Sequence, residues 1–386
     1  MRKWKVVFIA LALTILWPTI GLADEKSVNL APEAISAILI DSDTGTILYE
    51  KNGNQKLPPA SITKIMTMLL VVEAIDNGKI SLSDKVRASE YAASMGGSQI
   101  FLEPGEEMSV EDLLKGVAVA SGNDASIALA EYIAGTEEAF VQQMNEKAKQ
   151  LGMNNTHFSN SNGLPAENHY TTAYDISIMS RELLKYEDLI TKYTGIYQDY
   201  LRKDTNRPFW LVNTNRLVRF YPGVDGLKTG YTSEAKFCLA ATAKRDSLRV
   251  IAVVMGEPNS KVRNKEVAQM LDFAFSQYKN VSLYTKGQVV QSVAVDKGKE
   301  EKVNVIVPRN FSILLKKGEK EEAYQQEIQI EENIPAPIDK GRIVGKIVVK
   351  KDGREISSID LVAEKQINKA STWELITRTA KRMFLQ

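Results

Sequence analysis

Residues 62–75 constrain this fold most, because they have the pattern of a helix that is apolar on nearly every face. Such a helix is stable only when other parts of the protein cover all of its sides. Pro58-Pro59-Ala60 precedes it, and Asn77-Gly78 is a typical signal for its end. The chain has 386 residues, 44% of them hydrophobic, which is enough to build the core that this helix needs. The sequence therefore predicts a large globular domain with this helix in its middle.

Strand patterns lie on both sides of a helical stretch of the sequence. Residues 35–40 and 46–49 have the pattern of a hairpin, and strand patterns return at 237–243 and 249–255, before a helix over 264–278. Between them the apolar periodicity predicts helices over 110–119, 124–134, 138–151 and 176–184. We expect one sheet in which the N- and C-terminal strands pair and the helices form an insert, which is an α/β fold.

The composition changes after Lys279, where short runs rich in Val and Ile alternate with Pro and Gly. These runs predict a separate small all-β domain over residues 281–366, with strands at 289–295, 303–307, 327–330, 342–350 and 356–362. The region lacks clustered acids, histidines or nucleophiles. Its expected role is that of a spacer or docking surface.

The N-terminus has the order of charges and apolar residues that is typical of a secretion signal. Arg2, Lys3 and Lys5 precede an apolar run over 6–16, and Gly21-Leu22-Ala23 follows. The run is too short to span a bilayer comfortably. We expect residues 1–23 to be a signal peptide that is cleaved after Ala23, with an uncleaved anchor as the alternative, and the mature protein to be exported.

The last residues, 371–386, have the pattern of an amphipathic helix. Apolar side chains recur at spacings of three and four, and basic ones lie elsewhere on the helical wheel. We expect residues 370–386 to lie flat on a membrane surface as an anchoring helix. A helix that packs on its own protein remains the alternative.

Composition and residue spacing argue against a nucleic-acid partner, an internal disulfide and a zinc site. A net charge of +1 gives no electrostatic reason to expect nucleic acid as a partner. The single cysteine, Cys238, cannot form an internal disulfide and is expected to be buried and inert. His157 and His169 lack the spacing of a zinc site. We expect neither a metal nor an organic cofactor.

Three short clusters together indicate acyl transfer by an activated serine: Ser61-Ile62-Thr63-Lys64, Ser121-Gly122-Asn123 and Lys228-Thr229-Gly230. Each alone is weak evidence, since Ser276 to Lys279 also fits Ser-x-x-Lys. The three occur in order, with separations of 60 (121 minus 61) and 107 (228 minus 121) residues, and each lies at an expected boundary of secondary structure. Chance is a poor explanation for that combination.

The first two clusters supply a nucleophile and its base. We expect Ser61 to be the N-cap of the central helix, with Lys64 on the same helical face. A serine hydroxyl needs a base to become a nucleophile. A lysine can be that base if its pKa falls, which burial and a second positive charge such as Lys228 both favour. Ser121 can relay protons, and Asn123 can hold a substrate or Lys64.

The third cluster is expected to be a strand edge that pairs with a peptide backbone. Gly230 would let the two backbones approach closely. The backbone N–H groups of Ser61 and Tyr231 are the natural donors to an oxyanion.

Three longer phrases carry a resemblance to a known family: Pro59-Ala60-Ser61-Ile62-Thr63-Lys64, Ser121-Gly122-Asn123-Asp124-Ala125 and Asp225-Gly226-Leu227-Lys228-Thr229-Gly230-Tyr231-Thr232. The chain resembles the low-molecular-mass penicillin-binding proteins, the serine-type D-Ala-D-Ala carboxypeptidases, from about residue 34 to the terminal helix. The resemblance implies a β-lactamase/transpeptidase-like sheet with a helical insert, and a penicillin-binding serine peptidase domain over 24–280.

The resemblance also implies roles for individual residues. Ser61 would form the acyl-enzyme and Lys64 would be the base, with Ser121 and Asn123 assisting. Lys228 and Thr229 would bind the carboxylate end of the substrate. Arg263, which follows Met255-Gly256 at the family's interval, would contribute to recognition of the carboxylate.

The implied substrate is a peptidoglycan stem peptide, from which the enzyme removes the terminal D-alanine. β-Lactam antibiotics would be covalent inhibitors, and the protein would work at the outer face of the cytoplasmic membrane.

Lys236 departs from the pattern of the family, which more often has glycine at this position. Residues 169–172 either line the cleft or form a loop packed under the helical insert.

Three other functions remain as alternatives. A D,D-endopeptidase uses the same residues on a cross-linked peptide. A class A β-lactamase adds a Glu-x-x-x-Asn pattern after the Ser-x-Asn cluster, and no such pattern occurs between that cluster and Lys228-Thr229-Gly230. A non-catalytic envelope binding protein would have no need of the complete set of catalytic positions that this chain retains.

Overall fold

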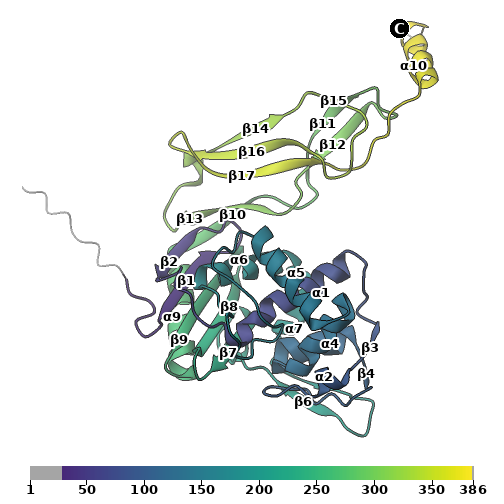
Figure 1. The fold of residues 1–386 in the computed structure, drawn as a ribbon. Helices are drawn as coiled ribbons and strands as arrows, with labels where there is room; N and C mark the ends of the chain where they lie inside the picture. Colours follow the sequence, from purple (N-terminus) through teal and green to yellow (C-terminus); the bar gives the residue numbers. More distant parts are fainter. Residues whose placement is uncertain (1–27, 385–386) are drawn as a thin grey trace, which may run out of the picture.

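The computed structural model describes residues 28–384, with side chains up to residue 378. The predicted signal peptide, 1–23, lies outside the described residues. Figure 1 shows a lower part, in which a sheet packs against helices, and an upper part made of strands, with helix α10 at its far end.

The lower part is built on a five-stranded antiparallel sheet in the order β2-β1-β9-β8-β7. Its strands are β1 (Ser36–Asp41), β2 (Ile47–Lys51), β7 (Val224–Thr232), β8 (Lys236–Arg245) and β9 (Leu248–Glu257). Strand β1 pairs with β9, so the predicted pairing of N- and C-terminal strands is confirmed. Strand β7 forms one edge of the sheet.

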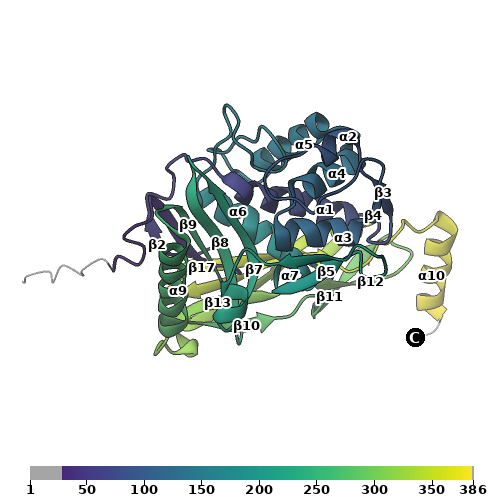
Figure 2. The same ribbon diagram turned by 90° about the horizontal axis from the view of Figure 1, so that it is seen from below.

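Helices cover both faces of this sheet because its strands are apolar on both sides. In β9, Ile251, Val253 and Met255 belong to the core shared with the helical insert, whereas Val250, Ala252 and Val254 belong to the core shared with α9 (Ser260–Gln277). Figure 2 shows α9 on one side of the sheet and α6 and α1 on the other.

The insert between β2 and β7 contains most of the helices and two small hairpins. Its helices are α1 (Lys64–Asp76), α2 (Glu90–Ala93), α3 (Val110–Lys115), α4 (Asn123–Ala134), α5 (Glu137–Gln150), α6 (Ala173–Leu183), α7 (Glu187–Thr194) and α8 (Leu217–Phe220). Strand β3 (Lys85–Arg87) pairs with β4 (Glu107–Ser109), and β5 (Gln198–Leu201) pairs with β6 (Phe209–Val212).

Helix α1 is the predicted central helix, and every residue from 64 to 72 is buried. The prediction that Ser61 is its N-cap is wrong. Residues Ala60–Thr63 form a separate 3-10 turn, and the α-helix begins at Lys64. The reason is the backbone of Ala60, whose φ of 48° bends the chain into this tight turn before the helix starts.

Two other helices begin or end at residues that differ from the predicted ones. The helix predicted over 110–119 is α-helical only to Lys115 and continues as a π-helical turn, Gly116–Ala120. That wide turn is followed by Ser121, which has a left-handed φ of 64°. Helix α9 begins at Ser260 rather than 264, because the side chain of Asn259 accepts hydrogen bonds from two backbone N–H groups of its first turn.

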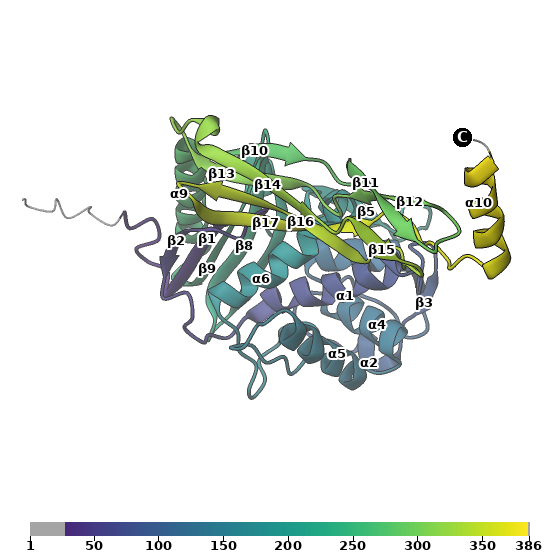
Figure 3. The same cartoon turned by 90° about the horizontal axis from the view of Figure 1, so that it is seen from above.

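The upper part is all β, as predicted. A six-stranded sheet has the order β14-β16-β17-β12-β11-β15, and β10 pairs with β13 in a second sheet. The strands are β10 (Tyr278–Tyr284), β11 (Val289–Asp296), β12 (Lys302–Ile306), β13 (Phe311–Lys316), β14 (Tyr324–Ile330), β15 (Asn333–Pro335), β16 (Ile343–Lys351) and β17 (Arg354–Ala363). Figure 3 shows this part lying across the sheet and helices of the lower part.

Strand β10 joins the two parts. It spans residue 280, where the domain boundary was expected. The Nδ2 of Asn280 donates a hydrogen bond to Asp41 Oδ1 (2.9 Å), which lies at the end of β1. The strand is therefore tied to both parts.

Helix α10 (Thr372–Phe384) ends the described chain. Arg378 ties it to the β-rich part, since its guanidinium donates hydrogen bonds to the carbonyls of Gly298 and Lys299. Trp373 and Ile376 are 76% and 55% exposed. Between residues 28 and 384, no helix has the length and apolar character that crossing a bilayer requires.

Candidate active site

The first two clusters meet at the amine of Lys64. Its Nζ lies 3.0 Å from Ser61 Oγ, 2.6 Å from Asn123 Oδ1 and 2.5 Å from the carbonyl oxygen of Asn162. Lys64 is fully buried, and Ser61 is partly exposed in the turn that precedes it. The amine thus has one hydroxyl neighbour and two carbonyl-type acceptors.

This arrangement suits a lysine that accepts a proton. Burial and then the positive charge of Lys228 lower the pKa of Lys64 well below its usual range, while Asp124 opposes the shift. A neutral amine has two N–H groups and one lone pair. Asn123 Oδ1 and the carbonyl oxygen of Asn162 can each accept a hydrogen bond from one of these N–H groups. The lone pair then faces the hydroxyl of Ser61.

A chain of hydrogen bonds holds the turn that carries Ser61. His169 Nδ1 accepts a hydrogen bond from the backbone N–H of Ser159, so Nε2 carries the ring proton. Nε2 lies 2.9 Å from Thr63 Oγ1, which in turn donates to the carbonyl of Ala60 (2.8 Å). Burial lowers the pKa of His169 to about 4, with a further contribution from His157, so the ring is neutral in this position.

The position of Asn123 depends on a loop that the sequence analysis did not single out. Asn123 Nδ2 donates to the carbonyl of Gly96 (2.7 Å), and its backbone N–H donates to Ser98 (2.7 Å). Gly97 has a φ of +78°, and a Cβ there would lie 2.9 Å from Asn123 Nδ2. The Gly96-Gly97 pair was the available signal that a backbone approaches closely here.

Ser121 lies beside this group in a left-handed conformation and is 3% exposed. Among the described residues its hydroxyl has no hydrogen-bond partner. It is therefore available to a substrate.

Asn162 was also missed. Its carbonyl contacts Lys64, and Gly163 beside it has a φ of +86°. A Cβ on Gly163 would lie 1.9 Å from the carbonyl oxygen of Ala60, so only glycine permits this packing. The run Ser161-Asn162-Gly163-Leu164-Pro165 has turn composition, but nothing local indicates which residue it contacts.

Strand β7 brings the third cluster to the same place. A Cβ on Gly230 would lie 3.0 Å from the carbonyl oxygen of Pro59 and 3.1 Å from Ala60 Cβ. The glycine thus allows β7 to pack against the 3-10 turn Ala60–Thr63 and the residue before it, whereas the sequence suggested that it makes room for a substrate. Both contacts place the strand edge beside Ser61.

Lys228 and Thr229, which precede Gly230, are almost completely buried. Lys228 is 1% exposed, and its Nζ donates to the carbonyl of Thr229 (3.0 Å). Burial and then the charge of Arg263 lower the pKa of Lys228 to about 7. Thr229 Oγ1 donates to Thr214 Oγ1 (2.7 Å), which fixes the rotamer of the threonine.

The remaining predicted residues lie at the edge of this group. Arg263 is buried on α9, and its guanidinium donates hydrogen bonds to Asn264 Oδ1. Burial lowers the pKa of Arg263 to about 10. It affects Lys228 electrostatically, but among the described residues it makes no hydrogen bond to Ser61 or Lys64. Tyr231 is 56% exposed and lies against Phe237, with ring centroids 4.4 Å apart.

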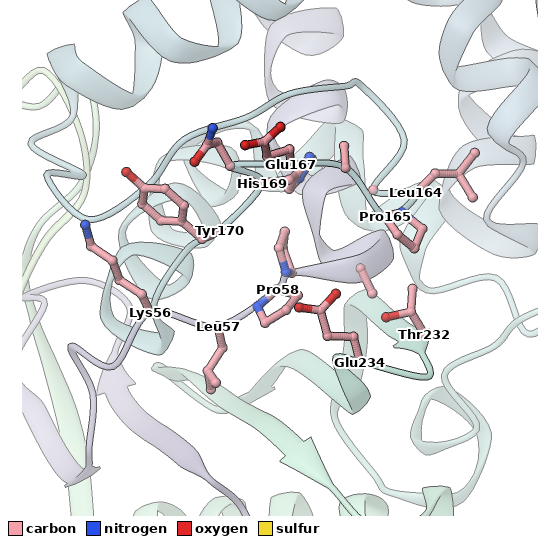
Figure 4. Close-up of a pocket in the computed structure, with 15 residues that line it drawn as sticks. Lys56, Leu57, Pro58, Leu164, Pro165, Glu167, His169, Tyr170, Thr232 and Glu234 are labelled. Atoms are coloured by element: carbon pink, nitrogen blue, oxygen red, sulfur yellow. The ribbon is translucent and has the colours of Figure 1, made fainter.

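A cavity of about 680 Å³ opens beside Ala60, the first residue of the 3-10 turn. Figure 4 shows Thr232 and Glu234 on one side of it and Glu167, His169 and Tyr170 on the facing loop. Of residues 169–172, His169 and Tyr170 line this cleft, whereas Thr171 and Thr172 are buried and do not. Within residues 28–384, no three His, Cys, Asp or Glu side chains are grouped as a metal site requires.

Comparison with known proteins gives two family matches. Residues 24–259 match the D-alanyl-D-alanine carboxypeptidase family, peptidase S11. Residues 278–369 match the C-terminal domain of penicillin-binding protein 5.

Individual relatives agree with these matches. The chain is 57% identical over 355 residues to the D-alanyl-D-alanine carboxypeptidase DacF of Bacillus subtilis, covering 92% of this chain and 91% of that protein. Penicillin-binding protein 5 from Haemophilus influenzae has a similar structure, with a TM-score of 0.69 at 32% identity over 87% of this chain and 98% of that one. Penicillin-binding protein D2 from Listeria monocytogenes, in its ampicillin-bound form, has a TM-score of 0.54 at 30% identity over 63% of this chain and 98% of that one.

Proposed function

Because the chain belongs to the peptidase S11 family of D-alanyl-D-alanine carboxypeptidases, we propose that Ser61 is the nucleophile with which it removes the terminal D-alanine from peptidoglycan stem peptides. The chain is an enzyme with D-alanyl-D-alanine carboxypeptidase activity, and it is a penicillin-binding protein. The observation that carries the assignment is the contact of Ser61 Oγ with an amine whose two other neighbours are carbonyl oxygens.

The proposed reaction begins with transfer of the Ser61 proton to neutral Lys64. Ser61 Oγ adds to the carbonyl carbon of the penultimate D-alanine, and the N–H groups of Ser61 and Tyr231 bind the oxyanion. When the C–N bond breaks, the amine of the departing D-alanine takes up the proton, with the hydroxyl of Ser121 as the relay. Water then hydrolyses the acyl-enzyme by the same proton transfers. Each oxyanion donor is worth a factor of about a hundred or more in rate.

The terminal carboxylate of the substrate would bind at Lys228 and Thr229. Both lie on the edge strand beside Ser61. Arg263 would add positive charge from behind Lys228, since the two groups interact electrostatically. A β-lactam presents a carboxylate and a strained amide to the same groups and would acylate Ser61, so β-lactams are expected to be covalent inhibitors.

Incubation with a pentapeptide ending in D-Ala-D-Ala tests the proposed function. We expect one equivalent of free D-alanine and a tetrapeptide, measured by a D-amino-acid oxidase assay and mass spectrometry. Cleavage of a cross-linked muropeptide without release of D-alanine from the pentapeptide would favour a D,D-endopeptidase instead.

We further propose the organisation of the whole chain. Residues 1–23 would be a signal peptide, 24–280 the catalytic domain, 281–366 the β-rich domain and 370–386 an anchoring helix. The cell-wall substrate of the family supports export to the outer face of the cytoplasmic membrane, where the stem peptides are. The exposed Trp373 and Ile376 lie one helical turn apart on α10 and support contact with a membrane surface.

Deletion of residues 371–386 should move the protein from the membrane fraction to the supernatant, with its carboxypeptidase activity retained. The physical reason is loss of the apolar side chains that would enter the interface. Trp373→Ser combined with Ile376→Ser should have the same effect. Ile343→Ser, at a residue 57% exposed on β16, is the matched control and should leave sedimentation unchanged. Equal sedimentation of the full and shortened chains would show that α10 is no anchor.

A further inference from the structure

The cavity beside Ala60 has features from which a substrate subsite can be inferred, and this inference rests on the proposed function. It is bounded by the segment from Lys56 to Ala60, the loop after Gly163 and the turn between β7 and β8. Its volume of about 680 Å³ lies within the range of sites that enclose a small ligand. The two D-alanine side chains are single methyl groups and would leave most of this space empty, so it has room for another part of the substrate.

The edge strand shows which part of the substrate reaches the cavity. Residues 226–230 of β7 are buried, Tyr231 is exposed and Thr232 is partly exposed. A peptide whose carboxylate binds at Lys228 and Thr229 can therefore continue only toward Tyr231 and Thr232. Thr232 lines the cavity. The residue before the two D-alanines consequently arrives at the cavity, because successive residues along a strand are about 3.3 Å apart.

The lining has apolar walls and unpaired acids. Leu57, Pro58, Leu164 and Pro165 form apolar parts of the wall, and Glu234 and Glu167 supply two carboxylates. Among the described residues, neither of these carboxylates makes a hydrogen bond or ion pair. The cation in the lining, Lys56, lies over the ring of Tyr170 at 4.5 Å from its centroid. Apolar walls with free carboxylates fit a long methylene chain that ends in an ammonium group.

The turn that carries Glu234 is held in place. Thr232 Oγ1 accepts a hydrogen bond from the backbone N–H of Ala235 (3.0 Å). Lys236, which stands where the family more often has glycine, closes the turn with a φ of 56°, a conformation that glycine adopts more easily. The left-handed geometry is thus retained, and Figure 4 shows the Glu234 side chain directed into the cavity.

We propose that this cavity binds the side chain of the residue that precedes D-Ala-D-Ala, and that Glu234, with Glu167 across the cavity, selects peptides in which that side chain ends in a free ammonium group. Glu234 lies on the turn next to the edge strand and is the principal determinant. Glu167 comes from the opposite loop and adds to the negative charge.

Two peptides that differ in one charge test this assignment. Nα-acetyl-L-Lys-D-Ala-D-Ala has a free ε-amine, and Nα,Nε-diacetyl-L-Lys-D-Ala-D-Ala does not. We expect the wild-type protein to have a kcat/KM about fivefold higher for the first peptide, which is the effect of a partly exposed ion pair. Glu234→Gln should bring the ratio of the two values close to one, and Glu167→Gln should reduce it less. The preference should also weaken with added salt.

Glu146→Gln is the matched control, since Glu146 is an exposed acid on α5 that does not line the cavity. It should leave the ratio at the wild-type value. A wild-type ratio of one, or a ratio that Glu234→Gln does not change, would overturn the assignment. Release of D-alanine from both peptides at equal rates would reject only this subsite, whereas release from neither would reject the proposed function.

Discussion

A Ser61→Ala variant is expected to release no D-alanine above background and to form no covalent adduct with a fluorescent penicillin. The hydroxyl that becomes the ester oxygen is gone, and no other serine approaches the amine of Lys64 within hydrogen-bonding distance among the described residues. Removal of a catalytic serine nucleophile typically lowers kcat by about a millionfold. Labelling on a gel and the rate of D-alanine release are the two measurements.

The chain contains a matched control for this experiment. Ser276 begins another Ser-x-x-Lys match, is exposed near the end of α9 and donates a hydrogen bond to the carbonyl of Phe273. Ser276→Ala should label and turn over like the wild-type protein. Ser61 is partly exposed, and within the described part of the chain its hydroxyl is hydrogen-bonded to Lys64 alone, so Ser61→Ala should fold normally, as thermal unfolding can show. A labelled Ser61→Ala protein would mean that the nucleophile is another residue.

Lys64→Arg is expected to lower the rate of acylation by a factor of about 10² to 10⁴, although the positive charge is kept. Arginine cannot lose its proton in a protein, so it cannot accept one from Ser61. A lysine that acts only through its charge would tolerate this change better. Stopped-flow acylation by a fluorescent penicillin measures the effect, and an acylation rate within threefold of the wild-type rate would contradict the role of Lys64 as the base.

The pH dependence of the wild-type protein follows from the same assignment. Lys64 has a pKa well below the usual lysine range, so it is neutral and active at the high end of the pH range and becomes protonated and inactive as the pH falls. Lys228 has a pKa of about 7, so above that pH it loses the charge that attracts a carboxylate, unless the bound substrate retains it. We expect kcat/KM to fall toward acid pH and KM to rise above about pH 7. A flat acid limb down to pH 5 would argue against Lys64 as the base.

The pairing of Ser61 with Lys64 could be predicted because it depends on local geometry. Two residues three positions apart lie on one side of a helical turn, whether that turn is α or 3-10. The choice between these two turns could not be predicted, since it depends on the left-handed backbone of Ala60 and on Thr63, His169 and Gly163, which are brought there by packing.

The sheet and the β-rich part could be predicted for a related reason. Alternating or continuous apolar runs indicate strands whatever their partners. The apolar runs in β8 and β9 indicated strands buried on both faces, and the strand pairing of β1 with β9 followed from the helical stretch between them. The exact strand order in the β-rich part, where β15 pairs with β11 in parallel, had no such signal.

By itself the sequence determined the order of the three clusters, the chemical groups they supply, and a helix that had to be buried at the centre. Only the tertiary structure decided that the carbonyl of Asn162, 98 positions from Lys64, accepts a hydrogen bond from its amine, that loop 96–98 holds Asn123, and that Glu167 and Glu234 line one cavity. The physical reason is that these contacts join residues far apart in the chain. Their positions follow from how whole elements pack, and no local pattern of residues encodes that packing.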